Sequence, residues 1–377
     1  MTSALEPLWV GCMSGTSLDG ADTVLTRWVN EGEHLRPDVL AHVHLPFGES
    51  LRAQLLALNT PGDNELHRAA LAANALSRHL AQGIHGVLER AGVAASQVRA
   101  AGVHGQTVRH QPAAYDGTGY TLQLLNPALL AELTSVAVVC DLRSRDVAAG
   151  GQGAPLVPAF HAALWGLSDP PVAVLNVGGI ANLTILSSSQ LVGFDCGPGN
   201  VFMDAWCQAH TGAPYDQEGQ WAQGGQVHAA LLQHLLDEPF FDRAPPKSTG
   251  RDLFDPAWLA SRLHRLPQPP AAQDVQATLC ELTAVCAARA LQRQAPNAQV
   301  LRVCGGGAYN LHLLKRLQAH LPGVEVETTS RAGVPADQVE ALAFSWLARA
   351  FVREEPLDLR AVTGARGPRR LGAYYPA

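Results

Sequence analysis

The sequence is poor in charge, and several features that mark other protein classes are missing from it. Only 16% of the 377 residues are charged, the net charge is −6, and no dense cluster of Lys and Arg occurs. Because clustered positive charge is what holds a nucleic-acid backbone, we expect no nucleic acid as a partner. No apolar run approaches the roughly 20 residues of a membrane helix, and the first residues lack the basic and apolar regions of a signal peptide. We therefore expect no membrane contact.

Cysteine is scarce and scattered. No pair is spaced as CxxC, and the total is an odd number, namely Cys12, Cys140, Cys196, Cys207, Cys280, Cys286 and Cys304. This pattern indicates buried thiols in a reducing compartment, without a disulfide framework or a zinc site. We expect a cytoplasmic protein, and we assign no residue to a metal with certainty. A length of 377 residues with 47% hydrophobic content fits two domains with real cores.

The chain also lacks a GxxxxGK[ST] motif, so it is not a P-loop protein. It has three other glycine-rich segments instead. Residues 14–22 and 178–182 each separate two apolar stretches and predict strand–turn–strand hairpins. The third segment, 305–307, follows the apolar stretch 300–304 and precedes a helix predicted from Asn310. Because the second half opens with the same device as the first, the pattern indicates two related halves.

Glycine-rich turns suit phosphate binding for two reasons. Backbone N–H groups in such turns can converge on an anion, and glycine allows close approach and positive φ. The N-terminus of a helix after residues 305–307 would add a third anion site. The alternative is that each turn simply closes its hairpin. Three such turns at matching places favour phosphate binding.

Asp195 stands in the segment Phe194-Asp-Cys-Gly-Pro-Gly-Asn200. The residues before it predict a strand, and Asn200 is placed to cap the helix that follows. A carboxylate held on such a tight turn can serve as a general base for a hydroxyl or water. The alternative is an Asp that hydrogen-bonds its own turn. Spacing alone leaves both open.

The segment Gly11-Cys-Met-Ser-Gly-Thr-Ser-Leu-Asp-Gly-Ala-Asp22 resembles the N-terminal signature of the anhydro-N-acetylmuramic acid kinases, a family with the actin, Hsp70 and sugar-kinase fold. The resemblance extends over nearly the whole chain, through residues 104–107, 141–146, 150–158, 176–184, 195–204, 245–251, 304–310, 337–344 and 362–365. It implies an α/β protein with a two-lobed, actin-like sugar-kinase ATPase fold. Each lobe would be a mixed β-sheet flanked by helices, with the ATP cleft between the lobes. We expect the N-terminal lobe at 1–135 plus 354–377 and the C-terminal lobe at 136–353.

The resemblance also implies a reaction. Such enzymes are ATP-dependent kinases that convert 1,6-anhydro-N-acetylmuramic acid, ATP and water to N-acetylmuramic acid 6-phosphate and ADP in peptidoglycan recycling. Asp195 matches the general base that directs water to the anomeric carbon while O6 takes the γ-phosphoryl group. The implied sugar contacts are Arg143, Asp146 and Glu340. The implied ATP-binding residues are Gly15, Thr16, Ser17, Leu18, Asp19, Gly20, Ala21, Asp22, Gly178, Gly179, Asn182, Gly305, Gly306 and Gly307.

One position departs from the wider fold. Many relatives carry Asp two residues before the first glycine of the phosphate loop, and Met13 stands there in this chain. The carboxylate that faces the metal ion must then come from Asp19, Asp22 or Asp195. Phosphoryl transfer still requires charge neutralisation, so we expect Mg²⁺ to arrive with ATP.

Other readings of these residues stay open. Arg143 could make a surface ion pair, and Glu340 could lie on a solvated helix face. His104 is more often structural than a phosphate ligand. Lys247 and Arg251 could approach phosphates or be solvated. At the level of function, the rivals are a phosphatase or polyphosphate hydrolase of the same fold and a non-catalytic sugar or nucleotide sensor. We expect a homodimer.

Overall fold

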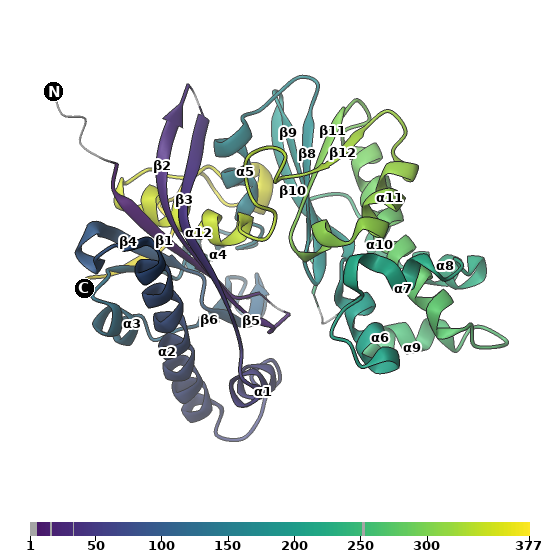
Figure 1. Ribbon diagram of the computed structural model, residues 1–377, viewed down its shortest axis with the longest axis horizontal. Helices are drawn as coiled ribbons and strands as arrows, with labels where there is room; N and C mark the ends of the chain where they lie inside the picture. Colours follow the sequence, from purple (N-terminus) through teal and green to yellow (C-terminus); the bar gives the residue numbers. More distant parts are fainter. Residues whose placement is uncertain (1–5, 16, 33, 251–252) are drawn as a thin grey trace. The chain divides into compact units, whose positions relative to one another are not determined.

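The chain forms two units in the computed structural model, which describes residues 6–15, 17–32, 34–250 and 253–377 (Figure 1). The first unit comprises Met1–Gly166 and Gln338–Ala377, and the second comprises Leu167–Asp337. Two residues considered above, Thr16 and Arg251, lie outside the described ranges.

The first unit contains a six-stranded mixed sheet in the order β13-β7-β4-β1-β2-β3. Strands β1 (Leu8–Met13), β2 (Gly20–Glu31) and β3 (His34–Pro46) are antiparallel neighbours. Strands β4 (Val98–Val103) and β7 (Val138–Cys140) continue the sheet parallel to β1, and β13 (Ala373–Tyr375) pairs antiparallel with β7. Strands β5 (Gln106–Pro112) and β6 (Gly119–Leu124) form a separate hairpin.

Helices cover both faces of this sheet. A Cβ added to Gly11 of β1 or Gly102 of β4 would collide with the backbone of α12 (Val339–Val352), so these glycines let α12 lie directly on the strands. On α2 (Glu65–Ala91), Gly83 meets Thr23, which pairs with Cys12. Since successive residues of a strand point to opposite faces, α2 and α12 cover opposite sides. The other helices are α1 (Glu49–Ala57), α3 (Pro127–Thr134), α4 (Ser144–Ala148), α5 (Val157–Trp165) and α13 (Arg360–Thr363).

The second unit repeats this topology. Its sheet has the order β10-β9-β8-β11-β12, with β8 (Val172–Val177), β9 (Ile180–Ser187) and β10 (Gln190–Pro198) antiparallel. Strands β11 (Val300–Cys304) and β12 (Glu325–Thr328) run parallel to β8. This is the order of β3-β2-β1-β4-β7, so the prediction of two related halves, each a mixed sheet flanked by helices, is confirmed. Its helices are α6 (Val201–Thr211), α7 (Gln220–Gln223), α8 (Ala229–Leu236), α9 (Pro256–Leu263), α10 (Ala272–Gln294) and α11 (Leu311–His320).

The boundaries of the units differ from the expected ones. Residues 136–166 and 338–353 group with the first unit, whereas the sequence places them with the second. The reason is pairing: β7 is hydrogen-bonded to β4, and α12 packs on β1 and β4. Residues 354–377 lie in the first unit, where β13 pairs with β7.

The predictions for two helix ends and for buried cysteines are confirmed. Gly92 ends α2 in the left-handed conformation, with φ of 63°. Asn126 caps α3, because its side chain accepts a hydrogen bond from the N–H of Leu129, and Pro127 occupies the first turn. All seven cysteines are buried and free. Among the described helices, none is both long and apolar enough to cross a bilayer.

Candidate active site

In each unit most of the candidate residues lie where strands end. In the first unit they follow β1, β4 and β7, which are parallel and therefore finish at the same edge of the sheet. In the second unit they follow β8 and β11, which are also parallel, and lie near the end of β10. In open α/β sheets, this carboxyl edge is where ligands bind.

The turn between β1 and β2 is tied to the connection between β4 and β5. The hydroxyl of Ser14 donates to the carbonyl oxygen of Gly105 at 3.0 Å, and the amide nitrogen of Gln106 donates to the carbonyl oxygen of Gly15 at 3.1 Å. The backbone N–H of Leu18 donates to the same carbonyl oxygen of Gly15 and closes the turn. Leu18 has a φ of 57°. The positive φ expected of glycine in this turn thus belongs to Leu18, and Gly15 does not have it. The turn is therefore held by one hydrogen bond within itself and by two to residues that follow β4.

Each of the three glycine-rich segments contains one glycine at which a Cβ would cause no clash or backbone strain within its own unit. A Cβ added to Gly15, Gly178 or Gly306 would find its nearest neighbouring atom 3.5, 3.7 and 3.5 Å away, which is ordinary contact. None of the three has positive φ. By contrast, Gly305 has φ of 75°, and a Cβ on Gly305 or Gly307 would collide with the end of β8. A ligand close to the backbone would explain the three open glycines.

His104 connects Arg143 to the first turn. The Nδ1 atom of buried His104 lies 3.1 Å from the carbonyl oxygen of Ser14, and its Nε2 accepts from the Nε and Nη2 of Arg143 at 3.2 and 3.1 Å. Burial, and then the charge of Arg143, lower the pKa of His104 to about 3. His104 is therefore neutral with its hydrogen on Nδ1, because a carbonyl oxygen only accepts. This geometry favours the structural role over phosphate binding.

Asp146 is a buried anchor beside Arg143. The residue is 1% exposed, and its two carboxylate oxygens accept from the N–H of Gly153 at 2.7 Å and from the hydroxyl of Thr363 at 2.8 Å. Burial raises the pKa of Asp146. The Nη1 of Arg143 donates to the carbonyl oxygen of the same Gly153 at 2.7 Å. Asp146 thus holds the loop that contacts Arg143.

The carboxylates of the first hairpin differ in what they contact. Asp22 on β2 holds His42 and His44 of β3 with a single oxygen, at 2.8 and 3.1 Å. Burial tends to raise the pKa of Asp22, but these two hydrogen bonds lower it overall. Asp19 accepts from the hydroxyl of Ser17 at 2.7 Å. In the described parts of the chain, no three His, Cys, Asp or Glu side chains are grouped as a ready metal site.

Asp195 lies on β10, opposite Asn182 of β9, just before an irregularity in the strand pairing. Its backbone N–H donates to the carbonyl oxygen of Lys247 at 3.1 Å. Its Oδ2 accepts from the backbone N–H of Thr249 at 2.9 Å. The side chain is half-buried. A segment 54 residues away therefore helps to position Oδ2.

Lys247 anchors the segment that holds Asp195. Its Nζ donates to the carbonyl oxygens of Phe240 and Phe241 at 3.0 and 3.1 Å and lies 4.6 Å from the centre of the Phe240 ring. Burial lowers the pKa of Lys247. Neither of the expected roles, a solvated lysine or a phosphate ligand, matches these contacts. The lysine positions the loop.

Three connections of the second unit converge. The backbone N–H of Asn200 donates to the carbonyl oxygen of Gly178 at 2.8 Å, and its side-chain amide donates to the carbonyl oxygen of Val177 at 3.0 Å. The same amide nitrogen would lie 3.5 Å from a Cβ on Gly306. Asn200 is the N-cap residue of α6, but its side chain makes no capping bond there. The predicted cap is wrong because this side chain holds the turn after β8 instead.

Glu340 lies in the first turn of α12 and is half-buried. The next residue, Ala341, has the carbonyl group that packs on Gly11, so Glu340 is placed near the carboxyl half of β1. Sequence reasoning gave no role to Gln106 or Thr249. Both stand inside segments quoted for the resemblance, but a backbone contact such as that of Thr249 leaves no compositional signal.

Comparisons with known proteins identify the family of this chain. A family model described as "Anhydro-N-acetylmuramic acid kinase" matches residues 7–377. The chain belongs to this family. The anhydro-N-acetylmuramic acid kinase of Variovorax paradoxus is 57% identical over 378 residues, covering 98% of this chain and 99% of its own length. That of Bordetella petrii is 58% identical over 373 residues, covering 98% and 96%. The predicted resemblance is confirmed.

A ROK family glucokinase from Streptomyces griseus, solved in complex with glucose and AMPPNP, is 12% identical, with a TM-score of 0.39. The match covers 91% of this chain and 99% of the glucokinase. The fold assignment rests instead on the family and on the strand order that the two units of this kinase share.

Proposed function

We propose that the protein is an ATP-dependent kinase that converts 1,6-anhydro-N-acetylmuramic acid, ATP and water to N-acetylmuramic acid 6-phosphate and ADP in peptidoglycan recycling. Kinases with this name match the full chain at more than 50% identity, which supports the sugar kinase over the phosphatase and sensor alternatives. The structural observation that carries the proposal is Asp195, whose Oδ2 is positioned by the N–H of Thr249.

Asp195 acts as the general base in this proposal. It takes a proton from a water molecule as that water attacks the anomeric carbon C1, and the bond between C1 and O6 breaks. O6 attacks the γ-phosphorus of ATP, and the bond from that phosphorus to the β,γ-bridging oxygen breaks, which releases ADP. The proton on Asp195 then passes to solvent. Water thus supplies the new oxygen on C1, and the sugar supplies the oxygen that bridges to phosphorus.

The three open glycines support the ATP site. We propose that phosphate oxygens approach the backbone at Gly15, Gly178 and Gly306, where a Cβ would have room in the protein alone. The remaining residues of the turns, namely Thr16, Ser17, Leu18, Asp19, Gly20, Ala21, Asp22, Gly179, Asn182, Gly305 and Gly307, would shape these sites. Mg²⁺ would neutralise charge on the phosphates. Asp19 suits the metal side better than Asp22, because Asp22 already holds two histidines.

The sugar contacts divide into direct and indirect ones. We propose that Arg143 and Glu340 contact the sugar, with the planar guanidinium of Arg143 suited to the lactyl carboxylate. Asp146 would act indirectly, because its carboxylate fixes the N–H of Gly153 while the carbonyl of Gly153 accepts from Arg143. The expected homodimer and cytoplasmic location stay predictions.

The test is whether ADP release depends on the anhydro sugar. The purified protein should release ADP from ATP and Mg²⁺ only when 1,6-anhydro-N-acetylmuramic acid is present, with one N-acetylmuramic acid 6-phosphate formed per ADP. N-acetylmuramic acid, which lacks the anhydro bridge, is the matched control substrate. Equal ADP release with no sugar present would favour a phosphatase instead, and no release under any condition would favour a sensor.

A further inference from the structure

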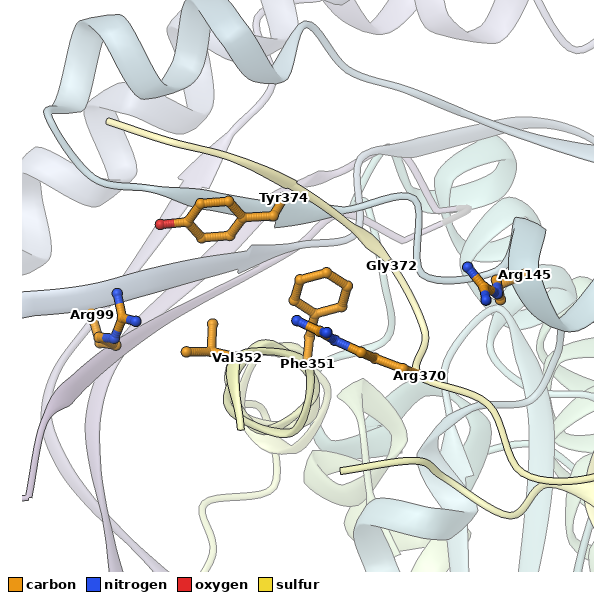
Figure 2. A pocket seen from close by; sticks show the side chains of 7 residues that line it. All are labelled: Arg99, Arg145, Phe351, Val352, Arg370, Gly372 and Tyr374. Atoms are coloured by element: carbon orange, nitrogen blue, oxygen red, sulfur yellow. The ribbon is translucent and has the colours of Figure 1, made fainter. Parts of the chain in front are cut away.

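The first unit contains a basic cavity that the proposed reaction does not use. It has a volume of about 520 Å³ and is lined by Arg99, Arg145, Phe351, Val352, Arg370, Gly372 and Tyr374 (Figure 2). This volume is in the range of small-molecule sites. Three of the seven lining residues are arginines, and none is Asp or Glu.

Two elements of the lining lead away from the candidate active site, whereas exposed Arg145 stands on α4 beside buried Asp146. Arg99 is near the start of β4, whereas His104 and Gln106 follow its end. Phe351 and Val352 end α12, whereas Glu340 is in its first turn. Twelve residues of helix from Glu340 to Val352 correspond to about 18 Å. The residues at the two ends of α12 therefore belong to separate sites.

Two of the arginines have no partner among the described residues. The side chains of Arg99 and Arg145 make no hydrogen bond or ion pair within that part of the chain. Figure 2 shows them on opposite sides of Phe351, so they approach the cavity from two directions. Like charges repel one another unless an opposite charge lies between them, and a bound anion would supply that charge.

The third arginine is partly held in place. The guanidinium carbon of Arg370 lies 4.1 Å from the centre of the Phe351 ring, and its Nη1 donates to Glu354 at 3.0 Å. Its Nε is buried and has no hydrogen-bond partner in the described ranges. Stacking on Phe351 thus orients a guanidinium beside the cavity while leaving one donor unused. Arginine presented in this way suits phosphate and carboxylate groups.

The lining also has an aromatic part. Tyr374 is 42% exposed, and its ring lies on the same side of the cavity as Arg99 (Figure 2). Glu354 offsets the charge of Arg370, and the C-terminal end of α12 contributes about half a negative charge, which is less than the two remaining positive charges of Arg99 and Arg145. The balance at the cavity is therefore positive, although the whole chain carries a net charge of −6.

We propose that this cavity is a second ligand site, which takes a small metabolite bearing at least two phosphate or carboxylate groups. Arg99 and Arg145 bind its acidic groups from two sides, and Arg370 contacts it beside Phe351. The site is distinct from the one that binds ATP and the sugar.

The test is direct binding with the nucleotide site filled. Pyrophosphate and citrate are titrated by calorimetry into the protein saturated with ADP, without Mg²⁺ because Mg²⁺ binds both anions. Pyrophosphate represents phosphate ligands and citrate represents carboxylate ligands. The variant is the double substitution Arg99→Gln with Arg145→Gln, which removes two charges without breaking a side-chain hydrogen bond or ion pair within the described chain. Arg52→Gln, an exposed arginine on α1, is the matched control.

We expect one pyrophosphate or citrate to bind per wild-type chain and per Arg52→Gln chain. The double variant should bind that anion about tenfold or more weakly, since hydrogen bonds between charged groups are strong. Its affinity for ADP should not change. If the protein binds pyrophosphate but not citrate, the ligand carries phosphate groups; if it binds citrate but not pyrophosphate, the ligand carries carboxylate groups. Equal affinity in the double variant, or no saturable binding of either anion by the wild type, overturns the proposal.

Discussion

Replacing Asp195 with Asn should remove catalysis while keeping the site intact. The carboxylate Oδ2 accepts from the backbone N–H of Thr249, and the amide oxygen of Asn can accept the same bond. A hydrogen bond to a charged acceptor contributes about 1.5–3 kcal/mol and one to a neutral acceptor about 0.5–1.5 kcal/mol. The free energy of unfolding should therefore change by about 1 kcal/mol. An amide nitrogen cannot take a proton from water, so the base is lost.

The kinetic cost follows from the role of the base. A positioned general base contributes about 10²–10⁴-fold to the rate, which corresponds to roughly 3–5 kcal/mol of activation free energy. We expect kcat of Asp195→Asn to fall by that factor while KM for ATP and for the sugar stays within about twofold. The assay is coupled ADP release, with ATP affinity measured separately by calorimetry.

The matched control is Asp274→Asn. Asp274 also accepts a backbone N–H with its carboxylate, from Gln226 at 2.8 Å, but it lies at the start of α10 and has no proposed catalytic role. Its substitution should leave kcat unchanged. If Asp195→Asn retains most of its activity, or if Asp274→Asn loses as much, Asp195 is a structural residue and the mechanism fails.

Three further outcomes are expected. Gly15→Val should raise KM for ATP at least tenfold without loss of stability, because a Cβ there meets no closer atom than Ser17 Oγ at 3.5 Å, whereas a bound phosphate would meet the added side chain. Gly48→Val, where a Cβ has nothing within 4 Å, should leave KM unchanged. Lys247→Met should lower kcat by about 10²-fold, with KM for ATP unchanged, because a small displacement of Asp195 misplaces the base. The control is Lys315→Met, at an exposed lysine, which should have no effect. An unaltered kcat in Lys247→Met would refute the positioning role. Finally, the free energy of unfolding should decrease as pH falls from about 6.5 towards 3, because the unfolded chain binds a proton at His104 that the folded chain does not. In urea titrations, His104→Gln should reduce the change of this free energy with pH by up to about 1.4 kcal/mol per pH unit. An unchanged pH dependence would contradict the prediction.

Patterns along the chain predicted much of the fold. The two glycine-rich hairpins and the segment 305–307 were enough to predict two related halves, because alternation of apolar strands and glycine turns is a local property. The lobe boundaries were not predictable in this way. The strand at 138–140 is apolar on both sides, and its sequence does not show that it pairs with β4 in the first unit.

Candidate residues were predictable where the residue type itself indicates the chemistry. They were not predictable where a role depends on tertiary contacts. Asp195 and the glycine turns became candidates through their motifs. The N–H of Thr249 and the anchoring role of Lys247 depend on the packing of a loop from residue 240 onwards against β10, which no local pattern specifies. Asn200 has the composition of a helix cap, yet tertiary contacts with Val177 and Gly178 draw its groups to the neighbouring turn.

The central claim is that one enzyme both opens the anhydro ring and phosphorylates the sugar, with Asp195 directing water to C1. The most direct measurement is mass spectrometry of the products formed from the anhydro sugar and ATP in ¹⁸O-water. The account predicts one ¹⁸O atom on C1 of N-acetylmuramic acid 6-phosphate and none in the transferred phosphate, because the bridging oxygen is the substrate's own O6. Label in the phosphate would mean that water attacked phosphorus, and an unlabelled C1 would mean that water did not open the ring. Either result would contradict the account.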